Sequence, residues 1–141
     1  MRSVKLIILI ISLPCYCFSQ GGIDHIKNQS YMKDGDKIDC NDPDPDNLTS
    51  RICANLQYQK SDSLLVIVYK KLLSEQTTDS ARKHIIDLQK DWRLFRDKHC
   101  SIVWNAYERG GHTKAVAYLK CLTELTTHRS KELENLLSEW I

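Results

Sequence analysis

The chain has 141 residues, with 20 Lys and Arg against 18 Asp and Glu, and its formal net charge at pH 7 is +2. This length suits one domain of ordinary size. Residues 1–19 hold two of the basic residues and none of the acidic ones, so the remaining chain has 18 of each sign. A neutral chain has no global field that would attract nucleic acid or an anionic membrane, and we expect neither as a partner.

The first 19 residues have the pattern of a secretory signal peptide, because basic residues precede an apolar run and a small residue, Ser19, ends the segment. The apolar run is too short to act as a stable membrane anchor. A lipoprotein signal that uses Cys15 or Cys17 is the alternative. The residues immediately before these cysteines are Pro and Tyr, not the small type that lipid modification favours. We therefore expect a periplasmic or secreted protein, attached to a membrane only if it is lipidated.

Residues 20–48 are predicted to be a flexible acidic leader. They show no helical or strand periodicity, and they contain three Gly, two Pro and, between positions 34 and 46, six Asp. This composition is typical of a solvated segment. The segment superficially resembles a calcium loop, but an EF-hand starting at Asp42 would need Gly at 47 and Glu at 53, where the chain has Asn and Cys. We predict a polar turn there and no metal site.

The helical domain is predicted to span residues 49–141. Apolar residues with helical spacing predict helices over about 49–75, 80–108 and 113–139. Short links between long helices favour an all-α, three-helix up-down-up bundle. The predicted N-caps are Thr49 or Ser50, then Asp79 or Ser80, then Thr113.

Each predicted helix has one stripe of residues that we expect to face the core. The first stripe is Ala54, Tyr58, Asp62, Leu65, Tyr69 and Leu72. The second stripe is Ile85, Leu88, Trp92, Phe95, His99, Ile102 and Ala106. The third stripe is Ala115, Tyr118, Leu122, Leu125, Arg129, Leu133, Leu136 and Trp140.

Four cysteines follow the signal peptide, which in an exported chain indicates two disulfides with three possible pairings. Cys100 and Cys121 are equidistant from Gly110-Gly111, each about 15 Å of helix rise from that turn. A helical hairpin brings such residues side by side. Cys40 lies thirteen residues before Cys53. We therefore predict the pairs 40–53 and 100–121.

A zinc site formed by Cys100, Cys121, His99 and His128 is the alternative to the second disulfide. Because His99 and Cys100 are adjacent, their side chains would diverge by about 100° on a helix. We favour the disulfide and expect no metal and no cofactor. No Gly-x-Ser-x-Gly motif, phosphate-binding loop or obvious nucleophilic cysteine suggests an enzyme.

Charged residues on or near the packing faces form a predicted polar network of Asp62, Arg96, Asp97 and Arg129. An unpaired buried charge is costly, so Asp62 needs a partner, for which Arg96 and Arg129 are the candidates. One interpretation is a set of ion pairs that fixes the helix register. The other is a polar patch that contacts a ligand.

Several motifs occur in order along the chain. They include Trp92-x-x-x-Arg96-Asp97-x-x-Cys100, Cys121-Leu122-x-x-x-Thr126-x-x-Arg129, Asp62-Ser63-Leu64-Leu65 and the Gly110-Gly111 turn. With them, residues 38–137 resemble the LprI-like family, named for the N-terminal domain of the exported lysozyme inhibitor LprI. Two positions depart from the family pattern: Val66 stands where Asn is usual, and His112 where a small polar residue often follows the Gly-Gly. The resemblance implies a helical, disulfide-bonded periplasmic or surface domain and, more weakly, lysozyme inhibition.

The leading functional prediction is a secreted or periplasmic binding protein without enzymatic activity, with a lysozyme as the specific candidate partner. The alternative is a structural or accessory protein of the cell envelope. We expect partner contact at the hairpin tip, through Arg109, Gly110, Gly111 and His112. The acidic leader is expected to assist, because lysozymes are commonly basic and opposite charges raise the encounter rate.

Overall fold

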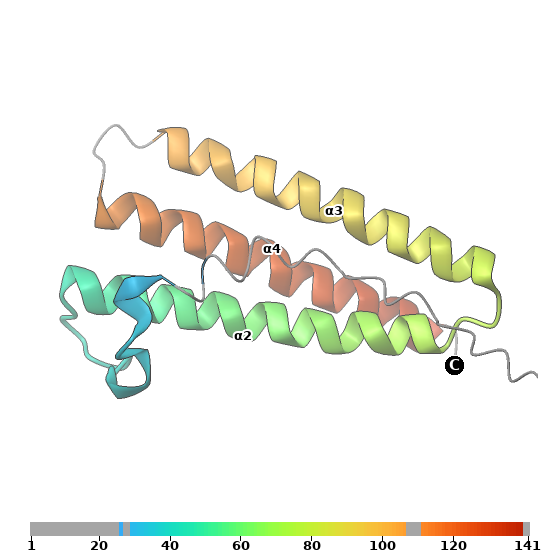
Figure 1. Ribbon diagram of the computed structural model, residues 1–141, viewed down its shortest axis with the longest axis horizontal. Coiled ribbons are helices and arrows are strands. Elements are labelled where there is room, and N and C mark those ends of the chain that lie inside the picture. Colours follow the sequence, from blue (N-terminus) through green and yellow to red (C-terminus); the bar gives the residue numbers. More distant parts are fainter. Residues whose placement is uncertain (1–25, 27–28, 107–110, 140–141) are drawn as a thin grey trace, which may run out of the picture.

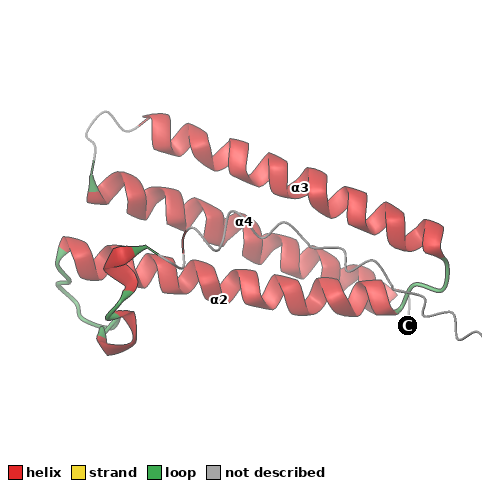
Figure 2. Ribbon diagram, in the orientation of Figure 1, coloured by secondary structure: helices red, strands yellow, loops and turns green. Residues whose placement is uncertain are grey.

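A computed structural model of the chain describes residue 26 and residues 29–106 and 111–139. It contains the α-helices α2 (Asn47–Ser74), α3 (Asp79–Ala106) and α4 (His112–Glu139), preceded by the 3-10 turns η1 (Ser30–Met32) and η2 (Gly35–Lys37). Figure 2 shows that this described part is helical, with no strand. The predicted all-α bundle is confirmed, whereas the predicted signal peptide lies outside the described residues.

The three long helices run up, down and up, as predicted (Figure 1). The closest packing is between α2 and α4, and α3 packs mainly on α4, so that α2 and α3 are the most widely separated pair. The start of α2, the end of α3 and the start of α4 lie at one end of the bundle (Figure 1), which we call the tip end. The leader turns also lie at the tip end, beside the start of α2.

The first two helices begin at caps other than the predicted ones. The N-cap of α2 is Asp46, whose Oδ1 accepts a hydrogen bond from the backbone N–H of Thr49 at 2.6 Å. Asp is a favoured N-cap, so α2 starts two residues before the predicted position. At the start of α3, Thr78 Oγ1 accepts from the N–H of Ala81 at 3.2 Å, a role predicted for Asp79 or Ser80.

The start of α4 depends on a glycine rather than on the predicted Thr113 cap. Gly111 has φ +97°, a conformation that other residues rarely adopt. Its carbonyl accepts a hydrogen bond from the N–H of Ala115 at 3.3 Å. The helix therefore begins at His112, immediately after the residue that turns the chain.

The core forms two clusters along α2, and the predicted α2 stripe is buried throughout. Nearer the tip end, Tyr58 of α2 and Cys100 of α3 pack with Leu122 of α4. Farther along, Leu65 and Leu72 of α2 pack with residues of α4 such as Leu133. Each residue of the predicted stripe, Asp62 included, is at most 6% exposed. The stripe consists of Ala54, Tyr58, Asp62, Leu65, Tyr69 and Leu72.

The predicted stripe of α3 is correct only in part, because Ile85 and Trp92 pack against the core whereas other members of the stripe are exposed. Leu88, Phe95 and Ile102 are 47%, 53% and 64% exposed. The fully buried residues of α3 are instead Gln89, Arg96 and Cys100. Each lies one position after a predicted residue, so its side chain points about 100° away from that residue about the helix axis. The helix turns this row inward because Cys100 is bonded to α4 and because long polar side chains reach partners on the other helices.

The α4 stripe is correct in part. Ala115, Leu122 and Leu133 are buried as predicted, but Leu136 is 37% exposed. The other buried residues of α4 lie on a neighbouring row, and two of them carry a hydroxyl group. They are Leu119, Thr126, Ser130 and Leu137.

Residues 29–38 differ from the solvated segment predicted for the leader. Asn55, which is fully buried in α2, donates through Nδ2 to the hydroxyl of Tyr31 at 2.9 Å and to the carbonyl of Ile26 at 3.1 Å. The guanidinium of Arg51 lies 4.1 Å from the centre of the Tyr31 ring. Polar contacts from α2 therefore hold this part of the leader against the bundle.

Candidate functional site

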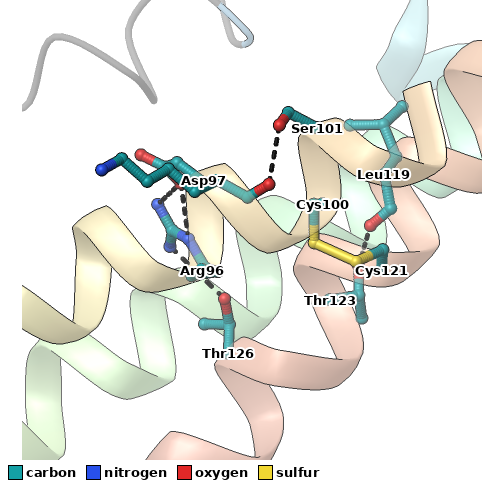
Figure 3. Close-up of a disulfide and its surroundings, with 9 residues drawn as sticks. Arg96, Asp97, Cys100, Ser101, Leu119, Cys121, Thr123 and Thr126 are labelled. Atoms are coloured by element: carbon teal, nitrogen blue, oxygen red, sulfur yellow. Dashed lines mark hydrogen bonds and ion pairs between the residues drawn. A yellow bond between two sulfur atoms is a disulfide. The ribbon is translucent and has the colours of Figure 1, made fainter. Parts of the chain in front are cut away.

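The buried polar cluster is centred on Arg96 of α3, which is 4% exposed. Its Nη1 lies 3.5 Å from Asp62 Oδ1 of α2 and donates to Thr126 Oγ1 of α4 at 3.4 Å. Its Nε and Nη2 contact Asp97 Oδ1 at 2.9 and 2.8 Å. Figure 3 shows Arg96 between Asp97 and Thr126. One side chain thus connects all three helices.

Two aromatic rings lie beside this guanidinium. The Arg96 carbon Cζ is 5.2 Å from the centre of the Trp92 ring and 5.7 Å from that of Tyr58. Burial raises the pKa of Tyr58 well above its ordinary value, and the positive charge of Arg96 only partly opposes this shift. The Tyr58 phenol is therefore neutral at physiological pH. Because Asp62 and Arg96 are almost entirely enclosed, this cluster favours the register interpretation over contact with a ligand.

Arg129, the other candidate partner of Asp62, is used differently. Its Nε donates to Gln89 Oε1 at 3.1 Å, and its Nη1 lies 3.0 Å from Glu132 Oε2. Its guanidinium also lies 5.8 Å from the Trp92 ring centre. The Trp92 ring is therefore contacted by two guanidinium groups, that of Arg96 from α3 and that of Arg129 from α4. Of the four predicted network residues, the structure brings Asp62, Arg96 and Asp97 together, and gives Arg129 other partners.

For three polar residues that form buried contacts the sequence predicts no such contact, although Thr126 is part of a family motif: Gln89, Thr126 and Asn55. The signal that identifies Gln89 and Arg96 is their spacing of seven residues, which with Cys100 defines the buried row of α3. Thr126 belongs to the motif that begins at Cys121, but its role depends on a hydrogen bond from Arg96 of another helix.

Both predicted disulfides are confirmed. Cys100 and Cys121 join α3 to α4 with their Cα atoms 5.7 Å apart (Figure 3), and Cys100 is fully buried. Cys40 and Cys53 join the leader to α2 with their Cα atoms 5.5 Å apart. The two sulfurs offered for the alternative zinc site are therefore used in the bond between α3 and α4.

The predicted tip residues are described only in part. Arg109 and Gly110 lie outside the described residues. Gly111 is exposed and supplies the positive φ, and His112 is the first residue of α4. The 100–121 disulfide holds together the two helices that enter and leave this turn.

An acidic segment, residues 39–46, precedes α2 at the same end of the bundle (Figure 1). Asp39 Oδ1 accepts from the N–H of Asn41 at 2.9 Å, and Asp42 Oδ1 accepts from that of Asp44 at 3.0 Å. These local turns and the bond to Cys53 fix the segment to the bundle. Several exposed carboxylates are thereby held at the tip end, beside the start of α2.

No group of three or more His, Cys, Asp or Glu side chains that could hold a metal ion occurs in the described part of the chain. Among the same residues, none of the helices has both the length and the apolar character needed to cross a membrane.

These features define a disulfide-bonded three-helix bundle with an enclosed ion-pair cluster. The chain belongs to the family described as lysozyme inhibitor LprI, whose profile matches residues 40–133. The match begins at the first disulfide cysteine, includes all of α2 and α3, and ends within α4, so the resemblance seen in the sequence motifs is confirmed. Comparisons with curated proteins and with solved structures give no match.

Proposed function

We propose that this protein is an exported, non-enzymatic inhibitor of a lysozyme-type muramidase. Membership in the lysozyme inhibitor LprI family carries this proposal. Inhibition of this kind requires that one protein occlude the cleft of another, with no chemistry on the inhibitor. Two disulfides and a bundle joined by an enclosed ion pair suit an exported protein that must remain folded outside the cytoplasm.

We further propose that the tip end makes the contact. The contact would use Arg109 to His112, and the 100–121 disulfide holds together the helices on either side, which would limit the freedom that α3 and α4 lose on binding. The acidic segment 39–46 lies at the same end and would attract a basic lysozyme over a distance of about one Debye length. The electrostatic attraction by the acidic segment and the direct contact by the turn would thus both occur at the tip end.

A second candidate is an accessory protein that binds another component of the cell envelope. The exposed apolar row of α3, formed by Leu88, Phe95 and Ile102, supports it. An apolar row of this kind is a common feature of helix-mediated protein contacts.

The test is a turbidity assay of a lysozyme on cell walls in the presence of the protein lacking residues 1–19, together with measured association and dissociation rates. Dose-dependent inhibition is expected. Replacement of both Arg109 and His112 by Ala should speed dissociation. A parent protein that neither binds nor inhibits lysozymes would refute the inhibitor proposal and favour the envelope partner.

A charge-matched pair of variants tests the role of the acidic segment. Asp39, Asp42 and Asp44 are changed to Asn, which retains the side-chain oxygen that accepts each turn hydrogen bond. Association at low salt should slow by roughly threefold to tenfold. The control changes three exposed carboxylates at the opposite end to Gln: Glu75, Glu134 and Glu139. Equal slowing by both variants would indicate an effect of net charge alone.

A further inference from the structure

A pocket of about 460 Å³ lies at the tip end, between the leader and the three helices. Its walls include Tyr31 of the leader, Arg51 of α2, Ser101 and Trp104 of α3, and Tyr118 and Leu119 of α4. Its volume falls in the range of about 300–1,000 Å³ typical of small-molecule sites. The enclosed ion-pair cluster of Arg96 is not part of it.

Three of the nine residues that line this pocket are aromatic: Tyr31, Trp104 and Tyr118. Trp104 is 42% exposed, and its ring meets Tyr118 edge to face with the ring centres 5.8 Å apart. On the opposite element, the Tyr31 ring lies against the Arg51 guanidinium. The Trp104 ring borders the hollow. The pocket therefore suits the apolar body of a ligand.

Two cations give the pocket a positive pole. Arg51 lines it directly, and Lys114 Nζ lies 4.8 Å from the centre of the Trp104 ring. Neither residue forms an ion pair with any residue that the structure describes. An arginine at a pocket wall is suited to a carboxylate, which its guanidinium can bind through two parallel hydrogen bonds.

We propose that this pocket binds a small anionic amphiphile, a molecule with a carboxylate or similar head on an acyl or aromatic body. The head faces Arg51, and the body lies between Trp104, Tyr118 and Leu119. Such a site is independent of the proposed inhibition of lysozyme, because it needs no protein partner.

The first experiment compares ligands that differ only in head-group charge. The protein lacking residues 1–19 is incubated with 8-anilinonaphthalene-1-sulfonate, an anionic aromatic probe whose fluorescence rises on binding. Decanoate, decanol and decyltrimethylammonium then compete below their micellar concentrations. Decanoate should displace the probe at a concentration about tenfold lower than the cation requires, a difference equal to one charge-assisted hydrogen bond. Equal displacement by the anion and the cation would overturn the assignment of an anion site.

The second experiment uses variants of the wall. Arg51→Met should weaken binding of the probe and of decanoate about tenfold. Arg82→Met, at the opposite end of the bundle, is the matched control. Because Arg51 also contacts the leader, Ser101→Phe provides an independent test: Ser101 is exposed, and the ring would fill the pocket while Arg51 stays. Loss of binding with unchanged circular dichroism is expected. A folded Ser101→Phe variant that binds like the parent would overturn the proposal and place the probe elsewhere.

Discussion

The guanidinium of Arg96 lies 3.5 Å from the carboxylate of Asp62, although these residues belong to the two helices that pack least closely on each other. Arg96 has the length to cross this gap, and Thr126 of α4 accepts a further hydrogen bond from the same Nη1. The ion pair therefore does more than satisfy two charges. It fixes the rotation of α3, and with it which residues of α3 face the core.

Removal of Arg96 is expected to destabilise the fold strongly. Arg96→Met should lower the free energy of unfolding by about 3–5 kcal/mol, because the buried Asp62 carboxylate loses its arginine. Asp62→Asn should cost less, since Arg96 retains Asp97 and Thr126. Urea denaturation of both variants and the double variant measures the coupling. Unfolding midpoints equal to that of the parent would show that the pair is solvated in solution.

The buried polar cluster could be predicted from the sequence only where a pattern within one helix reveals it. The stripe of α2 was correct because its apolar residues and Asp62 share one clear period. The α3 stripe is correct only in part, because Gln89 and Arg96 are buried by contacts with Arg129, Asp62 and Thr126, which lie on other helices. The spacing of Gln89 and Arg96 places them on one row of α3, but it does not show that this row is buried.

The leader illustrates the same limit. Its composition favours a solvated segment, and the contacts that hold it are made by single residues far along the chain, such as Tyr31 with Asn55. The disulfides, in contrast, followed from spacing about a turn, since the helices on either side are regular.

The rotation of α3 can be tested by comparing two large apolar residues. Phe95→Ala should change the free energy of unfolding by less than about 1 kcal/mol, because the side chain is half exposed. Leu122→Ala should cost about 2–5 kcal/mol, since Leu122 is 1% exposed and its loss leaves a cavity. Thermal or urea unfolding gives both values. A cost for Phe95 as large as that for Leu122 would favour the stripe predicted from the sequence.

The two disulfides are expected to differ in their access to reductant. Cys40 is exposed, whereas Cys100 is fully buried between α3 and α4. Mild dithiothreitol under native conditions should therefore open the 40–53 bond first, as alkylation and peptide mapping would show. Loss of the 100–121 bond should cost about 3 kcal/mol, from the constraint it places on the unfolded chain. Simultaneous opening of both bonds would indicate global unfolding rather than local access.

The same glycine-to-alanine change should have opposite effects at two positions. Gly111→Ala is expected to cost about 1 kcal/mol, because φ is +97° and a Cβ there is strained although nothing lies within 4 Å. At Gly35 no positive φ occurs, and an added Cβ would meet the mobile end of Met32 at 3.4 Å. Gly35→Ala should therefore be neutral or stabilising by up to about 1 kcal/mol. Equal losses at both positions would contradict the conformational argument.

Alkaline conditions should destabilise the fold through its buried tyrosines. Burial raises the pKa of Tyr58, and to a smaller extent those of Tyr69 and Tyr118, above the ordinary value of about 10. Above that pH the unfolded chain releases phenol protons that the folded chain retains. Fewer protons are then bound in the unfolded state, so the free energy of unfolding falls as the pH rises. Urea denaturation between pH 8 and 11 should show this decline, and Tyr58→Phe should make it shallower. Tyr31→Phe is the control, because it leaves the core tyrosines intact. A Tyr58→Phe slope equal to that of the parent would show that Tyr58 ionises as freely in the folded chain as in the unfolded one.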